Sequence, residues 1–179
     1  MTSRRTLLRN SAAVALGATA AGSFISAEPA EAQAPQPRSS ESRQRGRFEA
    51  QQEAEIVAVL KSYERALNAS DVAGVVQLYT DDAVLLPPEA PTAVGIDAVR
   101  ASYMGIFQTL DLDLTFKVAE VNVVSSDWAF LRSASTGVAT LLASGAQVPS
   151  SNHELFVLQK CHGPWKLARY SFSSVLPAA

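Results

Sequence analysis

The stretch Y-E-R-A-L-N-A-S-D-V-A-G-V-V-Q-L-Y-T-D-D-A-V, residues 63–84, joins two predicted helices to a short strand. Upstream, from Gln51 to Asn68, apolar residues recur at spacings of four, three and four, which is the pattern of one face of an amphipathic helix; they are Ile56, Leu60, Tyr63 and Leu67. Asn68-Ala69-Ser70 ends this helix, and Ser70 or Asp71 can cap a second one that runs to about Thr80.

Two adjacent carboxylates, Asp81 and Asp82, come directly before the apolar run 83–86, which Pro87-Pro88 closes. Aspartate at such a junction favours turns and hydrogen bonds to the local backbone. We therefore interpret the pair as turn residues between the second helix and a short strand. A catalytic role is the less favoured alternative.

Downstream, the hydrophobic period changes from helical to two. A loop over 89–94 leads to a third helix, from Gly95 to about Phe107. Strands are predicted over 112–123, 128–142, 153–161 and 165–175, with a loop over 145–149 and a bulge near Ala119-Glu120, where the apolar parity shifts. Helices first and strands after them predict an α+β fold, in which three N-terminal helices wrap a curved antiparallel sheet.

The N-terminal residues have the features of an export signal. Ser3-Arg4-Arg5-Thr6-Leu7-Leu8-Arg9 has the twin-arginine pattern, a mildly apolar run follows, and Ala30-Glu31-Ala32 is a cleavage site. We predict a twin-arginine signal over 1–32, a disordered linker over 33–50 and one domain over 51–177, in a periplasmic or extracellular protein.

Composition narrows the class of partner. The formal net charge is −2, which argues against a nucleic-acid partner and, after signal cleavage, against a membrane surface. Cys161 is the single cysteine, so no intramolecular disulfide can form. The two histidines have no spaced cysteine or carboxylate cluster beside them, and no glycine-rich phosphate loop is present. We expect neither a metal nor a cofactor.

Three stretches carry a family resemblance: residues 63–84, G-I-D-A-V-R-A-S-Y over 95–103, and N-H-E-L-F-V-L-Q-K over 152–160, with W-K-L-A-R-Y closing the sheet. The chain resembles the NTF2-like superfamily and, within it, the SnoaL-like and ketosteroid-isomerase-like branches. This resemblance implies a cone formed by the sheet and helices around an apolar cavity. It does not fix a reaction, because these proteins share a fold and differ in chemistry.

The resemblance also implies roles for particular residues. Tyr63 matches the tyrosine that donates a hydrogen bond to the ligand oxygen in such isomerases, and Tyr103 matches the tyrosine that supports it. The second donor, a carboxylic acid, is matched by Glu154, or by His153 if the register slips by one residue. The position of the catalytic base falls on Pro87, which cannot carry a proton, and Glu89 is a weak substitute.

Other residues are predicted to line the cavity with less specific roles. Arg132 either points inward, to pair with Glu154 or an anionic ligand, or lies on the outer face of the sheet. Leu86, Phe107 and Phe116 are expected to contact the ligand or to fill the cavity themselves. Two functions stay open: a domain that binds a small apolar molecule, with isomerase- or cyclase-like acid–base chemistry, and a non-catalytic scaffold or sequestering protein. In either case we expect a homodimer that forms through the sheet.

Overall fold

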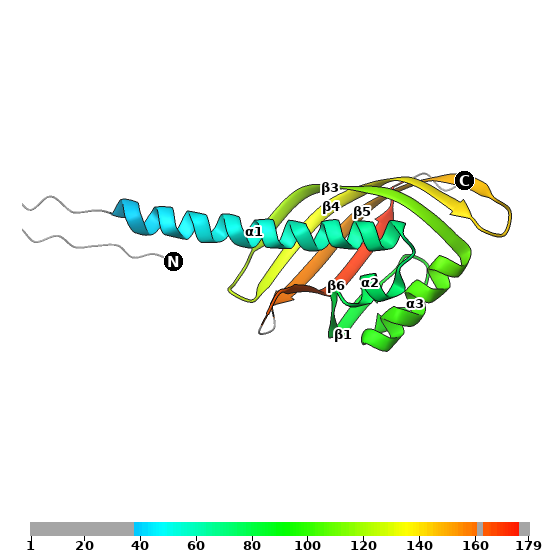
Figure 1. Cartoon of the computed structure of the whole chain (residues 1–179), viewed down its shortest axis with the longest axis horizontal. Coiled ribbons are helices and arrows are strands. Elements are labelled where there is room, and N and C mark those ends of the chain that lie inside the picture. Colours follow the sequence, from blue (N-terminus) through cyan, green and yellow to red (C-terminus); the bar gives the residue numbers. More distant parts are fainter. Residues whose placement is uncertain (1–37, 161–162, 176–179) are drawn as a thin grey trace, which may run out of the picture. The chain divides into compact units, whose positions relative to one another are not determined.

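Three helices and one six-stranded sheet make up the domain, in a computed structural model that describes residues 38–160 and 163–175 (Figure 1). The elements are α1 (Arg38–Asn68), α2 (Val72–Val76), β1 (Tyr79–Leu86), β2 (Ala93–Val94), α3 (Ile96–Thr109), β3 (Leu110–Val123), β4 (Trp128–Leu141), β5 (Ala146–Lys160) and β6 (Trp165–Ser174). The strand order is β2-β1-β6-β5-β4-β3. The signal-peptide prediction and Cys161 lie outside the described residues.

The predicted α+β class is confirmed, with one correction to the sheet. The four long strands are antiparallel, but β1 pairs with β6 in parallel, so the sheet is mixed. The sheet curves over α1, with α2 and α3 beside its β1 edge (Figure 1). The predicted bulge is confirmed, because the β3–β4 register shifts between Val118 and Glu120.

The strand boundaries differ from the predictions at two places. β5 begins at Ala146, so the expected loop over 145–149 is mostly strand, and a short turn joins it to β4. β1 begins at Tyr79, because the second helix ends after five residues at Val76. The strand β2, inside the expected loop over 89–94, was not predicted.

Asp81 and Asp82 are therefore not turn residues between helix and strand. Both lie within β1 with exposed side chains, at an irregular stretch of the pairing with β6. Asp82 accepts a hydrogen bond from Arg169, with 3.4 Å between Oδ2 and Nη2. Neither aspartate lines the cavity described below. The cap of α2 is Asp71, whose side chain accepts from the Gly74 N–H at 2.9 Å.

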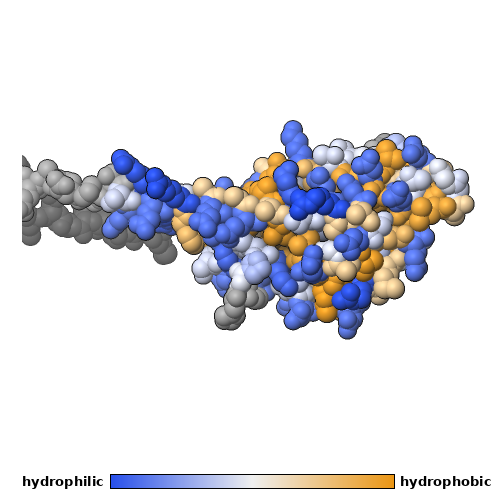
Figure 2. All heavy atoms as spheres, in the orientation of Figure 1, coloured by the Kyte–Doolittle hydropathy of each residue, from blue (hydrophilic) through white to orange (hydrophobic). Residues whose placement is uncertain are grey.

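The N-terminal half of α1 corrects the expected linker. Residues 38–50 are helical, whereas a disordered segment was predicted as far as residue 50. Residues 40–51 are exposed, and Figure 2 shows hydrophilic residues over this part of the helix. Such a polar helix gains support from pairs one turn apart, and Arg45 and Glu49 form one at 3.1 Å.

The C-terminal half of α1 carries the predicted apolar face. Ile56, Leu60, Tyr63 and Leu67 are all buried. Polar side chains from the same helix bind the middle of β3: Asn68 both donates to the Leu114 carbonyl at 2.8 Å and accepts from its N–H at 3.0 Å. This pair of hydrogen bonds fixes the position of β3 along α1, and therefore the position of the cavity wall that both elements form.

Nearer the N-terminus, α1 is joined to the sheet by a second polar contact. The Gln52 Oε1 accepts from Lys160 Nζ at 3.0 Å and from Trp165 Nε1 at 3.1 Å. Lys160 also pairs with Glu55 at 3.0 Å. Gln52 and Trp165 are only 4% and 2% exposed. We call these four residues the Gln52 cluster.

Candidate functional site

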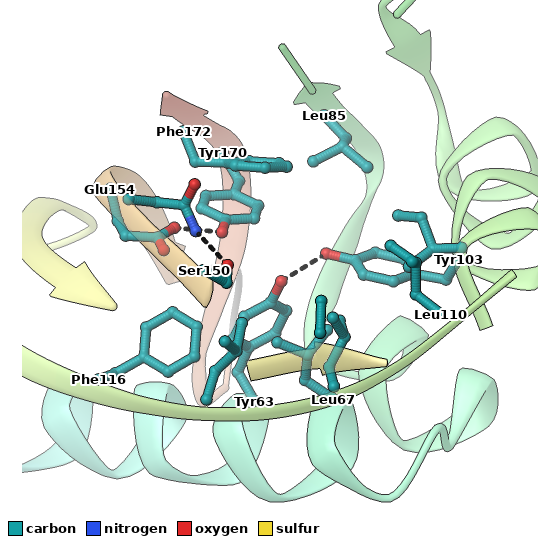
Figure 3. Close-up of a pocket in the computed structure, with 15 residues that line it drawn as sticks. Tyr63, Leu67, Leu85, Tyr103, Leu110, Phe116, Ser150, Glu154, Tyr170 and Phe172 are labelled. Atoms are coloured by element: carbon teal, nitrogen blue, oxygen red, sulfur yellow. Dashed lines mark hydrogen bonds between the residues drawn. The ribbon is translucent and has the colours of Figure 1, made fainter. Parts of the chain in front are cut away.

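A cavity of about 190 Å³ lies between the helices and the concave side of the sheet (Figure 3). Most of its wall is apolar and includes Leu67, Leu85, Ile106, Leu112, Leu114 and Phe116. Hydroxyl, amide and carboxyl groups also line it, from Tyr63, Tyr103, Tyr170, Asn152 and Glu154. An apolar space with a few convergent polar groups is the usual form of a small-molecule site.

Three buried tyrosines form a hydrogen-bonded chain at the helical side of the cavity. The Tyr103 hydroxyl lies 2.8 Å from the Tyr63 hydroxyl and 2.8 Å from the Tyr79 hydroxyl. The three residues come from α3, α1 and β1, and each is at most 2% exposed. We call them the tyrosine chain.

The tyrosine chain has one proton more than its internal bonds use. Three hydroxyls carry three protons, and two bonds consume two of them. Tyr79 does not line the cavity, so its proton is best satisfied by donation to Tyr103, which then donates to Tyr63. This order leaves the proton of Tyr63 available to an acceptor in the cavity. Desolvation raises the pKa of all three phenols well above the usual value, which keeps them protonated donors.

Glu154 stands at the sheet side of the cavity and is 3% exposed. The Ser135 hydroxyl donates to its Oε1 at 2.5 Å. The Tyr170 hydroxyl donates to its Oε2 (Figure 3). Asn152 Nδ2 in turn donates to the Ser135 Oγ at 3.2 Å. We call these four residues the carboxyl cluster. Its side chains project from β4, β5 and β6, and the antiparallel registers bring them together.

Burial and hydrogen bonding act in opposite directions on this carboxyl group. Desolvation raises the pKa of Glu154, and the bonds from Ser135 and Tyr170 partly offset that rise. The net pKa is above the ordinary glutamate value. Tyr170 is fixed by its ring, which stacks on Phe156 with 4.2 Å between centroids and a 3° interplanar angle. The cluster therefore holds a rigid, partly desolvated carboxyl group against an apolar space.

Arg132 and His153 lie on the other side of the sheet. Side chains alternate along a strand, so residues next to Ser133 and Glu154 point away from the cavity. Arg132 Nε pairs with Glu120 Oε2 at 3.2 Å, and both side chains are largely exposed. With Leu155 and Ser171, Arg132 and His153 line a second groove of about 360 Å³, to which Glu154 and Phe172 of the cavity wall also contribute. The register assigns the inward position to Glu154 rather than His153, and the outward interpretation of Arg132 is the one observed.

The remaining predicted residues divide in the same way. Phe116 is 8% exposed and lines the cavity. Phe107 packs on Tyr103 with 5.8 Å between ring centroids but is not part of the wall. Leu86 is 40% exposed, and its neighbour Leu85 points inward instead. Neither Pro87 nor Glu89, the position of the missing base and its possible substitute, lines the cavity.

Five polar residues of the site were not predicted: Tyr79, Ser135, Ser150, Asn152 and Tyr170. Tyr79 was assigned to the second helix, where its hydroxyl had no evident partner. Tyr170 belongs to the W-K-L-A-R-Y stretch, which was used only as evidence for the fold. Its parity with Phe172 on a strand that faces the helices was the signal that could have placed it in the cavity. Ser135 and Asn152 carry no comparable signal.

Within residues 38–160 and 163–175, no group of three histidine, cysteine or carboxylate side chains is placed to hold a metal ion. None of the helices in those residues has the length and apolar character needed to cross a bilayer.

The comparison with known families now has a structural context. The family model for the SnoaL-like domain matches residues 59–162, more than half of the chain. The chain belongs to the SnoaL-like family. Within this SnoaL-like domain, the match begins in α1 and extends past the end of β5, so it includes the tyrosine chain and most of the carboxyl cluster.

Solved structures agree with this assignment. A ketosteroid isomerase-like protein from Erwinia carotovora atroseptica SCRI1043 is 41% identical, with a TM-score of 0.67 over 69% of this chain and 96% of its own. A conserved protein from Planctomyces limnophilus DSM 3776 is 22% identical, with a TM-score of 0.62 over 69% and 97%. An NTF-2 like protein of unknown function from Shewanella oneidensis MR-1 is 19% identical, with a TM-score of 0.54 over 67% and 97%. The last two support the NTF2-like fold alone. No curated protein matches the sequence significantly.

Proposed function

We propose that this SnoaL-like domain binds a small, mostly apolar molecule through one oxygen atom and catalyses a proton transfer on it, in the manner of an isomerase or cyclase. The observation that carries the proposal is the position of the Tyr63 hydroxyl, at the end of the tyrosine chain and at the wall of an apolar cavity, where the donor order inferred above leaves it a proton to donate. A preorganised donor of this kind stabilises the negative charge that develops on a carbonyl oxygen when a neighbouring carbon loses a proton.

The volume of the cavity limits the size of the molecule. Small-molecule sites usually enclose about 300–1,000 Å³, and an apolar cavity of about 150 Å³ holds benzene. At about 190 Å³, this cavity suits one ring with a carbonyl or hydroxyl group rather than a fused polycycle. A cyclic ketone such as cyclohexanone is therefore a suitable first probe.

The test compares Tyr63→Phe with Tyr79→Phe. Both variants remove one hydroxyl from the tyrosine chain, but only the first removes the donor that faces the cavity. Protein-observed NMR titration with cyclohexanone should give an affinity about tenfold lower for Tyr63→Phe and a smaller change for Tyr79→Phe, as loss of one hydrogen bond predicts. Native mass spectrometry of the purified chain would identify any molecule that it already carries. Equal affinities in wild type and Tyr63→Phe would contradict the proposal.

The second candidate function is a dimerising scaffold, and the outer face of the sheet supports it. Leu155 is 46% exposed there, and Phe130 and Val157 point to the same side. An apolar sheet face of this kind suits a second copy of the chain. Sedimentation of Leu155→Glu beside wild type tests the dimer: a dissociation constant raised at least tenfold is expected. A dimer without any binding of cyclic ketones would favour the scaffold over the catalytic proposal.

We also propose that the chain is exported through the twin-arginine pathway. The support is Arg4-Arg5 with the apolar run and Ala30-Glu31-Ala32 that follow it in order. Replacing both arginines by lysine should leave the precursor uncleaved in the cytoplasm, which a mass measurement of the fractionated protein would detect. Normal processing of that variant would contradict this route.

A further inference from the structure

We propose that Glu154 is an ionised hydrogen-bond acceptor at rest and is itself the group that takes and returns the substrate proton. The inference rests on the proposed function, because it assigns the proton-transfer step of the same cavity. It replaces the role that family resemblance implies for Glu154, a protonated acid that donates to the ligand oxygen.

The direction of the hydrogen bonds around Glu154 carries the argument. Ser135 Oγ accepts from Asn152 Nδ2 at 3.2 Å and donates its own proton to Glu154 Oε1 at 2.5 Å. Tyr170 donates to the other oxygen, Oε2. A carboxyl group that receives a donor at each oxygen is stabilised as the carboxylate, whereas a protonated one would need one of these two hydroxyls to turn and accept from it.

The carboxylate keeps the capacity to accept a proton. Its two oxygens offer about four lone-pair positions, of which Ser135 and Tyr170 occupy two. Burial next to apolar walls destabilises the charged form relative to water, so the group is a stronger base than an exposed glutamate. Pro87, where the resemblance places the base, supplies no competing proton acceptor and does not line the cavity.

The step balances within the cavity. A Glu154 oxygen forms a bond to a hydrogen on the carbon next to a ring carbonyl, and the electron pair of the broken C–H bond becomes the new C=C bond. The carbonyl π electrons move onto oxygen, where Tyr63 donates a hydrogen bond to the enolate. Tyr63 and Glu154 both line the cavity (Figure 3). Return of the proton from Glu154, to the same carbon or to a conjugated one, restores the carboxylate. No oxidant, reductant or cofactor is consumed.

The first experiment uses 4-nitrophenol, a single-ring acid whose anion resembles an enolate and whose absorption spectrum reports its ionisation. If Glu154 is a carboxylate, binding the phenolate requires uptake of one proton. Above the pKa of the probe, wild-type affinity should then fall about tenfold for each pH unit, as linkage of one proton requires. The neutral Glu154→Gln variant should instead bind with constant affinity over the same range, and more tightly than wild type at its upper end.

The two roles of Glu154 predict opposite outcomes. A protonated Glu154 that donates to the ligand would give wild-type affinity that does not fall with pH, together with weaker binding in Glu154→Gln, and that result would overturn the inference while leaving the ligand site intact. Absence of saturable binding to wild type at every pH would overturn the proposed function as well. Glu120→Gln, at an exposed glutamate on the opposite face of the sheet, is the matched control for loss of a carboxylate.

The second experiment follows hydrogen–deuterium exchange beside the carbonyl of cyclohexanone by NMR. Glu154→Gln should lower the protein-catalysed rate by a factor of about 10² or more, the usual contribution of a positioned base. Ser135 and Tyr170 act through Glu154 as positioning residues. Ser135→Ala and Tyr170→Phe should each move the acidic limb of the rate–pH profile to higher pH, because loss of a donor raises the pKa of the carboxyl. Unshifted profiles in both variants, or wild-type exchange in Glu154→Gln, would overturn the inference.

Discussion

The domain contains buried polar groups in two regions, the Gln52 cluster and the wall of the cavity, which differ in what lies beside them. In the Gln52 cluster, one amide oxygen accepts from Lys160 and Trp165. These hydrogen bonds join α1 to β5 and β6. The tyrosine chain and the carboxyl cluster lie at a cavity of about 190 Å³, and the donor order inferred for the tyrosine chain directs the Tyr63 proton into that space. Buried polar groups stabilise the fold where they hydrogen-bond one another. Where one of them faces a cavity instead, it is available to bind a ligand or to react.

The largest effect is expected from breaking the Gln52 cluster. Gln52→Met keeps the length of the side chain but leaves the buried Trp165 N–H without its acceptor. The free energy of unfolding should fall by about 2–3 kcal/mol, the cost of a buried donor left unpaired plus a lost hydrogen bond. Chemical denaturation measures it.

The neighbouring residue gives the control for that variant. Gln51 is exposed, and its side chain donates to Glu55 in an exposed hydrogen bond, so Gln51→Met should change stability by less than about 0.5 kcal/mol. The affinity for cyclohexanone should be the same in both variants. Weaker ligand binding in folded Gln52→Met would mean that the Gln52 cluster and the ligand cavity are coupled, and would contradict a purely structural role for the Gln52 cluster.

A second pair of variants tests whether a larger side chain can fill the cavity without destabilising the domain. Ala139 is buried at the cavity wall, whereas Ala83 is fully buried away from it. Ala83→Leu should cost about 1–3 kcal/mol through overpacking. Ala139→Leu can place its added carbons in the cavity, so its stability should stay within about 1 kcal/mol of wild type while cyclohexanone binding is lost. Equal destabilisation in the two variants would indicate that the space at Ala139 is too small for a ligand.

The pH dependence of stability offers a third test, at the carboxyl cluster. The pKa of Glu154 is raised in the folded chain, so the folded state holds this proton more strongly than the unfolded state does. Its contribution to stability is then fully present below the ordinary glutamate pKa and is lost as the pH rises through the folded value. Glu154→Gln lacks this loss, so the stability of the variant relative to wild type should increase with pH across that window.

Denaturation at a series of pH values measures that difference. Glu120→Gln, at an exposed position, gives the effect of removing a glutamate charge without desolvation, and the trend in Glu154→Gln must exceed it. A difference that decreases as the pH rises would show that the hydrogen bonds from Ser135 and Tyr170 outweigh burial.

The smallest effect is expected on the outer face of the sheet. The Arg132–Glu120 pair is solvent-exposed, with side chains 58% and 42% accessible. Arg132→Ala should therefore change the free energy of unfolding by less than about 0.5 kcal/mol and leave the affinity for 4-nitrophenol unchanged. A loss of affinity comparable with that of Tyr63→Phe would place the ligand on this face, and would reverse the assignment of the site.

Several features of the fold were predictable because they depend on local periodicity. The buried face of α1, including Ile56 and Leu60, follows from spacings that only a helix brings together. The bulge beside Val118 follows from a change of parity along β3. Tyr63 and Glu154 are predicted as site residues by the family resemblance rather than by their spacing. The start of β1 at Tyr79 was missed, since a short apolar run does not by itself distinguish the end of a helix from a strand.

The sequence by itself determined the α+β class, the apolar surfaces that build the core, and the presence of a carboxyl group and tyrosines for a cavity. Only the tertiary structure decided which side chains meet. The bonds Tyr63–Tyr103 and Tyr170–Glu154 join residues 40 and 16 positions apart, through helix packing and strand register. A shift of one residue in register would exchange Glu154 with His153, or Leu85 with Leu86, between the cavity and solvent. Because such a choice depends on the packing of the whole domain, no single segment of the sequence contains it.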